Sequence, residues 1–408
     1  YAALQKDLGR ILCIVTPGEA EATRFAGDLN VLGIPAAVFP ARDYLLRPIE
    51  GTGREYEYRR LSVLGDLVGG RLRAVCVPQE ALTQYTTPRT DFCANTRTLH
   101  AGDTLPREEL TALLYGAGYT RRAQVDGPGQ FSVRGDIVDI YAPDMKQPVR
   151  MEFWGDEIDT LHTFDLATQR RDESISKIYV SPAREVLLGA PPAAAELLRA
   201  FLKKQRGKKR TALESCLAPE LSQLDAGVMP VNMDKYLAVR YPEPATVLDY
   251  LDEPLLIFEE PASVKEAQRA ADFRRGEELA ALLQDGVLAA GLGDLYANAA
   301  WLWAQTGRYP TICAENFVRS MPDIPLKIVV NAPAHTLPAW SGEVAALLED
   351  VNPLYSGGAA VTVMAGTARA AAGLANDLRT HGLQVTTDAA AAPAAGLVQV
   401  LPGQLSAG

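Results

Sequence analysis

The residues from Val149 to Trp154 constrain the fold of this chain more than any other segment. Three apolar residues alternate there with two charged residues and a tryptophan: Val149, Arg150, Met151, Glu152, Phe153 and Trp154. A period of two places the two sets on opposite faces of a β-sheet. If the aliphatic set faces the core, Trp154 stands on the solvent face beside Arg150, a composition typical of protein-binding hot spots. Alternation alone leaves the opposite orientation open, with Trp154 in the core.

The surroundings of this segment predict an antiparallel α+β unit. A helix is expected over Arg107–Tyr115, followed by several short strands with no helices between them. Turn sequences separate the strands at Asp126–Gly129, at Pro143-Asp144 and at Gly155-Asp156. Strands joined by such turns, without crossover helices, pair in antiparallel fashion. We expect this unit to extend to about Pro182.

The first 80 or so residues have a different pattern, in which strands and helices alternate. Strands are expected at Ile11–Val15, Ala36–Phe39 and Leu72–Val77, with helices ending near Leu32 and spanning Glu55–Leu67. Thr16 and Glu19 have the spacing of a capping box, with Pro17 at the first helical position. Strands that alternate with helices predict a mostly parallel sheet covered on both faces.

Two further regions follow the antiparallel unit. Residues 183–330 are dominated by helical sequence, notably Ala193–Leu224, which we expect Gly207 and Pro219 to interrupt. Buried strands are expected at Leu255–Phe258 and Ile328–Val330. From about residue 331 we expect a small α/β unit, whose elements are Ala360–Met364, Thr367–Thr380 and strands near Val385 and Val398. The chain is therefore predicted to be a multidomain α/β protein.

The composition of the chain disfavours several functional classes of protein. A chain of 408 residues is too long for a single core. Its net charge of −10 disfavours nucleic-acid binding through the overall field, although a local basic patch could still bind phosphates. Five scattered cysteines without CxxC spacing fit a reducing cytoplasm, and the four histidines lack metal-ligand spacing. No apolar stretch of about 18 residues predicts a membrane span. Because the chain begins at Tyr1, within an expected helix, we expect it to be part of a longer protein.

Catalytic motifs are sparse. The sequence contains no G-x-x-x-x-G-K-[ST] phosphate loop, and Gly51–Gly53 and Gly366-Thr367 are interpreted as a turn and a strand-to-helix junction. Glu259-Glu260 follow an expected strand, where motor ATPases place carboxylates that act on metal and water. Here the pair runs directly into Pro261, so we interpret it as a degenerate ATPase motif at an exposed strand end. We predict no catalytic or metal-binding residues.

A basic run at Lys203–Arg210 has two interpretations. Its lysines and arginines could bind phosphates, or they could form a solvated helix face. The sequence alone leaves any DNA contact by this run open.

The segments Phe131–Tyr141 and Pro148–Ile158 resemble a signature shared by two families, the nucleotide excision repair protein UvrB and the transcription-repair coupling factor Mfd. Phe39–Tyr44 and Val247–Leu251 are similar to the same group, and the resemblance spans nearly the whole chain, more loosely over the last 80 or so residues. Three features favour the Mfd family. UvrB has a tyrosine-rich hairpin where this chain has a short passage at residues 45–53, and an Asp-Glu-Ser-His motif at the position of Glu259-Glu260. An α/β unit without helicase motifs also ends the chain.

The resemblance implies a domain layout and a binding surface. It places a UvrB-like domain 1a at residues 1–88, an inserted UvrA-binding domain 2 at 89–182, domain 1b at 183–330 and a small α/β domain 3 at 331–408. The UvrA-contacting positions of the family correspond to Arg134, Arg150 and Trp154, the last in place of an expected phenylalanine. If the two strands that carry them are neighbours, all three side chains meet on one surface.

The resemblance also implies a function. The chain would be the non-catalytic N-terminal module of a bacterial coupling factor, a cytoplasmic monomer that recruits UvrA to lesion-stalled transcription and helps regulate a C-terminal ATP-driven translocase. RNA polymerase, double-stranded DNA, ATP and Mg would bind parts of the parent protein outside this chain. The alternative is a UvrB-type or helicase-type ATP-dependent enzyme that processes damaged DNA.

Overall fold

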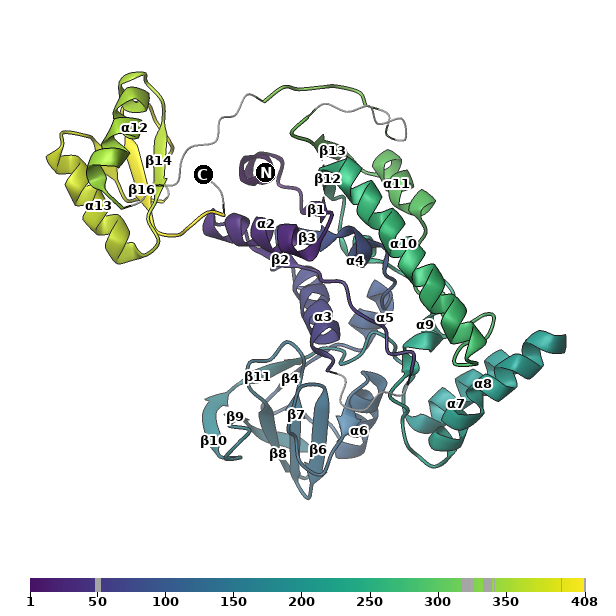
Figure 1. The fold of residues 1–408 in the computed structure, drawn as a ribbon. Helices are drawn as coiled ribbons and strands as arrows, with labels where there is room; N and C mark the ends of the chain where they lie inside the picture. The colour runs from purple at the N-terminus through teal and green to yellow at the C-terminus, as the bar shows by residue number, and fades with distance from the viewer. Residues whose placement is uncertain are drawn as a thin grey trace.

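The structure is a computed structural model that describes residues 1–47, 53–317, 324, 326–332, 340, 342–389 and 391–406. It contains both parallel and antiparallel sheets, as expected for a multidomain α/β protein (Figure 1). The turn expected at Gly51–Gly53 lies mostly outside the described residues, as does part of the short passage at residues 45–53. In the described part of the chain, no helix is both long and apolar enough to cross a membrane.

A five-stranded parallel sheet forms the centre of the molecule. Its order is β13-β12-β1-β3-β2, built from Leu12–Thr16 (β1), Ala36–Val38 (β2), Ala74–Pro78 (β3), Leu255–Glu259 (β12) and Thr311–Ala314 (β13). Every residue of β1 and β3 is buried, as expected for a parallel sheet covered on both faces. Residues 255–314 thus complete a sheet that residues 12–78 begin.

Helices cover the two faces of this sheet. Glu19–Val31 (α2) packs on the face that includes Leu12 and Ile14, and Glu55–Val68 (α3) packs on the face that includes Cys13 and Val15. The remaining elements of this region are Ala2–Leu8 (α1), Gln79–Thr83 (α4), Arg89–Ala94 (α5), Val247–Tyr250 (η2), Pro261–Gln284 (α10) and Ala299–Arg308 (α11). The strand-and-helix alternation predicted for the first 80 residues is confirmed.

Three local predictions are wrong. Ile328–Val330 is not a strand, and its side chains are between 67% and 79% exposed. The edge position beside β12 belongs instead to β13, which pairs with it in parallel register. Thr16 does not cap α2, because it is the buried last residue of β1 and its hydroxyl donates to the carbonyl of Gly18. Pro219 does not interrupt its helix but lies inside it.

The antiparallel unit forms a six-stranded sheet of order β10-β9-β8-β7-β6-β5. Its strands are Thr120–Arg121 (β5), Gln130–Arg134 (β6), Ile137–Tyr141 (β7), Val149–Trp154 (β8), Glu157–Phe164 (β9) and Arg171–Ile175 (β10). All pairs are antiparallel except β5 with β6. Leu110 and Leu114 of α6 (Arg107–Gly116) pack into the core on its inner face. A separate ladder of β4 (Arg97–His100) and β11 (Lys177–Val180) joins the start of the unit to its end.

A helical layer follows, and a buried ion network holds it to the parallel sheet region. The layer contains Pro191–Lys203 (α7), Gly207–Asp225 (α8), Met233–Tyr236 (η1) and Leu237–Arg240 (α9). Arg42 contacts Asp234 at 2.8 Å and Glu185 at 3.2 Å, and Arg60 contacts Glu185 at 2.5 Å. All four side chains are almost completely buried. Removal of one charged partner from such a network leaves another charge uncompensated, so these contacts fix the junction.

The C-terminal unit has its own core and its own parallel sheet, of order β14-β16-β15. Its elements are Val344–Ser356 (α12), Val361–Met364 (β14), Ala368–Thr380 (α13), Val385–Thr386 (β15) and Val398–Leu401 (β16). Thr367 caps α13 by accepting a hydrogen bond from the backbone N–H of Ala370, so Gly366-Thr367 is the predicted strand-to-helix junction. Beyond β16, Ser406 bonds to Asp28 of α2, and Figure 1 shows the chain returning toward that helix.

Candidate functional site

The outer face of the strands β6, β7 and β8 carries the predicted binding residues. Trp154, at the end of β8, has 83% of its surface exposed, so the alternative that places it in the core is wrong. The register aligns Arg134 with Ile137, and Asp139 with Arg150. Arg134 and Arg150 therefore share the face opposite to the buried core. The strands that carry the arginines are not neighbours, because β7 lies between them.

A buried aspartate on β7 connects the two arginines. Asp139 is completely buried, and its Oδ2 lies 2.5 Å from Nη2 of Arg134. Arg150 contacts the same carboxylate twice, from Nε to Oδ1 at 2.7 Å and from Nη2 to Oδ2 at 2.9 Å. The hydrogen bonds that Arg150 donates to Asp139 raise the pKa of the Arg150 guanidinium above its usual value. Two strands on either side of β7 thus place their arginines together through one carboxylate.

Arg150 is held much more tightly than Arg134. Its guanidinium lies over the ring of Phe164, at 4.7 Å from the centroid, and Nη1 donates to the carbonyl of Gln169 at 3.2 Å. Its side chain is only 12% exposed, whereas that of Arg134 is 42% exposed. Arg134 and Trp154 are therefore the accessible groups of the outer face. Arg150 is mostly covered and mainly links β8 to Asp139 of β7.

Asp139 was not among the residues predicted from sequence. The signal was present, because a carboxylate in the middle of the apolar strand Ile137–Tyr141 must be neutralised when it is buried. The contact of Asp139 with Arg134 and Arg150 follows only from the order of the strands, which cannot be read from the sequence.

The Glu259-Glu260 pair lies at the end of β12, as predicted. Both carboxylates already accept hydrogen bonds from other residues of the chain. The Tyr1 hydroxyl donates to Glu259 at 2.5 Å, and burial, followed by the charge of Glu260, raises the pKa of Glu259. Glu260 precedes α10 in a left-handed conformation, with φ of 48°, and accepts hydrogen bonds from the backbone and side chain of Asn316. Their hydrogen bonds resemble those of a structural strand end more than those of a metal site.

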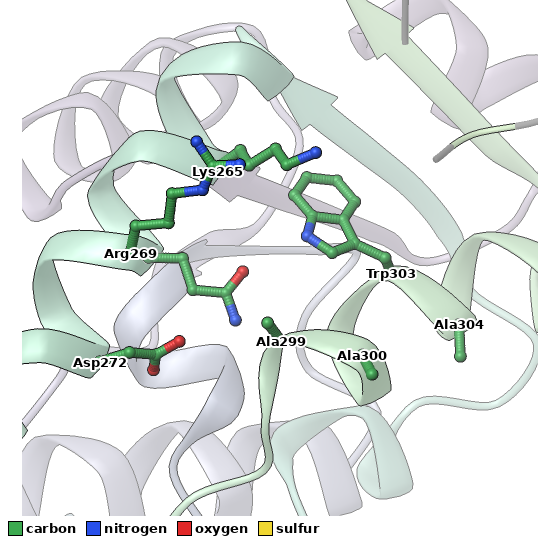
Figure 2. Close-up of a pocket in the computed structure, with 8 residues that line it drawn as sticks. Lys265, Arg269, Asp272, Ala299, Ala300, Trp303 and Ala304 are labelled. Atoms are coloured by element: carbon green, nitrogen blue, oxygen red, sulfur yellow. The ribbon is translucent and has the colours of Figure 1, made fainter. Parts of the chain in front are cut away.

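The helices α10 and α11 enclose a cleft of about 500 Å³ (Figure 2). Lys265 and Arg269 extend from α10 on the side of Trp303, whose ring stacks on Phe258 at 5.3 Å. Asp272 is the only carboxylate among the lining residues, which include no histidine, cysteine or serine. This lining offers neither a nucleophile with a base nor a pair of carboxylates, the groupings that general acid–base and nucleophilic catalysis use.

The basic run at Lys203–Arg210 does not form one helix face. It spans the end of α7, the turn that follows and the start of α8. Its last residue, Arg210, contacts Glu214 one turn along α8 at 2.7 Å. Whether the run binds phosphates stays a prediction.

Comparison with known proteins gives a consistent result. Residues 98–186 match the family described as the UvrB interaction domain. A transcription-repair-coupling factor of Bacillus subtilis is 24% identical over 420 residues, which include 100% of this chain and 35% of that protein. The chain is a homologue of transcription-repair-coupling factors. Those of Mycobacterium tuberculosis and Haemophilus influenzae are 32% and 29% identical, over 65% and 60% of this chain.

The chain spans about a third or less of the length of these coupling factors. The matched interval 98–186 contains the whole six-stranded sheet, and with it the outer face that carries Arg134, Asp139, Arg150 and Trp154. The candidate surface and the family match therefore coincide.

Proposed function

We propose that this chain is a non-catalytic recognition module that binds UvrA through the outer face of β6, β7 and β8. Trp154 would be the apolar anchor, Arg134 would contact partner carboxylates, and Arg150 would position both Asp139 and Arg134. Tryptophan and arginine are among the residues enriched at the energetic centres of protein interfaces. In the parent protein, the module would recruit UvrA to lesion-stalled transcription in nucleotide excision repair.

The single observation that supports this proposal most strongly is the exposure of Trp154. A tryptophan that is 83% exposed at the end of an otherwise ordered strand contributes nothing to the core of its own domain. It lies in the interval that matches the UvrB interaction domain. A protein partner that buries the indole would remove a large apolar surface from water.

The proposed layout is that of a UvrB-like protein. Residues 1–88 and 183–330 would form domains 1a and 1b, residues 89–182 the UvrA-binding domain 2, and residues 331–408 domain 3. The union of β1, β2 and β3 with β12 and β13 in one sheet supports the pairing of 1a with 1b. RNA polymerase, double-stranded DNA, ATP and Mg would bind elsewhere in the parent, whose translocase this module would help to regulate.

The alternative, an ATP-dependent enzyme of the UvrB or helicase type, has less support. It needs free carboxylates beyond β12, whereas Glu259 and Glu260 accept hydrogen bonds from Tyr1 and Asn316. Calorimetry with Mg-ATP separates the two functions. The proposed module gives no heat of binding, and micromolar affinity with turnover would favour the enzyme.

The direct test is the affinity of the 408-residue chain for purified UvrA, compared with that of Trp154→Ala. Truncation of a central tryptophan typically costs about 2 kcal/mol or more, so we expect at least about thirtyfold weaker binding. Phe273→Ala on α10 is the matched control, because Phe273 is also a largely exposed aromatic, at 68%. Equal affinities for the wild-type chain and for Trp154→Ala would refute the proposal.

A further inference from the structure

A second cleft, of about 380 Å³, lies on the opposite side of the inserted sheet from the surface described above. Three parts of the chain line it: the start of α3, the segment from Tyr115 to Arg122, and the residues around the two ends of the α7–α8 pair. Tyr115 belongs to α6 and contacts Phe131 of the inner face. The cleft is therefore on the helix side of the sheet, away from Trp154.

Apolar side chains form much of the cleft, and several are exposed. Val186 and Leu188 are buried in its wall. In the loop between α8 and η1, Val228 is 56% exposed, Met229 37% and Val231 48%. Neighbouring exposed apolar side chains at the rim of a cleft mark interaction sites more often than isolated ones do.

The loop that carries these side chains is held in place by Arg54. Its Nη2 donates to the carbonyl of Val231 at 2.8 Å, and its Nη1 contacts Glu57 at 2.8 Å. Because Glu57 is almost completely buried, this contact ties the loop to α3. A surface held in this way loses less conformational entropy on binding.

The charges that line the cleft are unbalanced. Arg121 and Arg122 are exposed, and neither guanidinium has a hydrogen-bond or ion-pair partner among the described residues. Arg184 makes one long hydrogen bond, of 3.4 Å, to the hydroxyl of Thr120.

Both carboxylates in the lining are already neutralised by other arginines. Glu57 is paired with Arg54, and Asp234 accepts two hydrogen bonds from Arg42, at 2.8 and 3.2 Å. The cleft thus keeps an excess of positive charge in a chain whose net charge is −10. Carboxylates or phosphates of a ligand would balance this charge.

We propose that this cleft binds an acidic peptide segment of a partner protein, with carboxylates facing Arg121, Arg122 and Arg184 and an apolar side chain on the Val228–Val231 loop. Arginine clusters recognise acidic motifs by bidentate hydrogen bonds, and the adjoining apolar loop accepts an aliphatic or aromatic residue.

Single-stranded nucleic acid fits the cleft less well, because it needs exposed aromatic planes on which bases stack. Tyr119 is 3% exposed and its hydroxyl donates to the carbonyl of Ser181, while Tyr115 packs edge-on against Phe131 at 5.3 Å.

The test uses the full chain and a short fluorescein-labelled peptide of alternating glutamate and leucine, followed by fluorescence anisotropy. We expect saturable binding that weakens at least about tenfold in Arg121→Glu/Arg122→Glu. Arg369→Glu on α13 is the matched control, because Arg369 is also an exposed arginine without an ion-pair partner among the described residues. A glutamine–leucine peptide separates the charge contribution from the apolar one and is expected to bind more weakly.

Three results would overturn this proposal: no binding to the wild-type chain, equal binding to the double variant, or displacement of the peptide by oligothymidine with higher affinity than the peptide itself. Met229→Ser provides a second variant that leaves the arginines intact, and it is expected to weaken binding of the glutamate–leucine peptide. Trp154→Ala, on the other side of the sheet, is expected to bind the peptide as the wild-type chain does.

Discussion

The end of β12 and the outer face of β8 both carry charged residues, but they differ in which groups are left for a partner. At the end of β12, Glu259 and Glu260 are occupied by Tyr1 and Asn316. On β8, the ion pairs to Asp139 lie beneath the surface and Trp154 projects from it. The acidic strand end, which resembles a catalytic motif in sequence, is satisfied within the chain. The sheet face keeps an apolar group that the described residues leave exposed to solvent.

The largest expected effect comes from Asp139→Ala. Removal of this buried carboxylate leaves Arg150, which is mostly buried, without its counterion, and loss of one partner of such a pair costs about 3 kcal/mol. We expect the urea midpoint of the inserted sheet to fall and UvrA binding to be lost together. Asp172→Ala on β10 is the control, because Asp172 is an exposed carboxylate of the same sheet. An unchanged midpoint would mean that Asp139 does not organise this face.

The next comparison is between the two arginines. Arg134→Ala is expected to weaken UvrA binding about tenfold with little change in stability, because the side chain is 42% exposed. Arg150→Ala should weaken binding as well, but also lower stability by about 2 kcal/mol, because a mostly buried side chain and the two hydrogen bonds that it donates to the buried Asp139 are lost. Parallel measurements of affinity and urea unfolding distinguish these roles. Equal stability losses in both variants would contradict the assignment of Arg150 as the link between β8 and Asp139.

Asp139 also shows what sequence reasoning could and could not supply. The alternation along β8 was sufficient to place Trp154 and Arg150 on the same face of the strand, because side chains on a strand alternate with a period of two. Which of the two faces is buried required the structure, in which Trp154 is exposed. The shared carboxylate depends on β7 lying between β6 and β8, which is a property of strand order. Local patterns contain no information about that order, so the arginines were predicted on one surface without the group that holds them.

The wrong strand at Ile328–Val330 has a similar cause. It and Thr311–Ala314 are both short segments with apolar residues, but only the latter pairs with β12. The choice depends on α10 and α11, which return the chain to the edge of the sheet before β13. Thr16 failed as a helix cap for a comparable reason, since pairing with Pro78 of β3 extends β1 to include it.

The smallest expected effect concerns Glu259. Burial raises the pKa of this carboxyl above the 4.5 of the free side chain, so the folded state binds the proton more tightly than the unfolded state does. Its contribution to stability is therefore greatest below pH 4.5 and is lost as the pH rises through the folded-state pKa. As the pH rises through that pKa, Glu259→Gln should become more stable relative to the wild-type chain. Urea unfolding at a series of pH values measures this difference. Glu266→Gln, at an exposed position of α10, should show no such trend.

The environment of Trp154 in the UvrA complex tests the central claim most directly. The chain contains four tryptophans, and 5-fluorotryptophan labelling gives each its own ¹⁹F signal, with Trp154 assigned by Trp154→Phe. On addition of unlabelled UvrA, we predict that the Trp154 signal moves to a new position while that of Trp340, in the C-terminal unit, keeps its chemical shift. A Trp154 signal that stays in place at saturating UvrA would show that the indole remains in water, and would contradict the proposed docking surface.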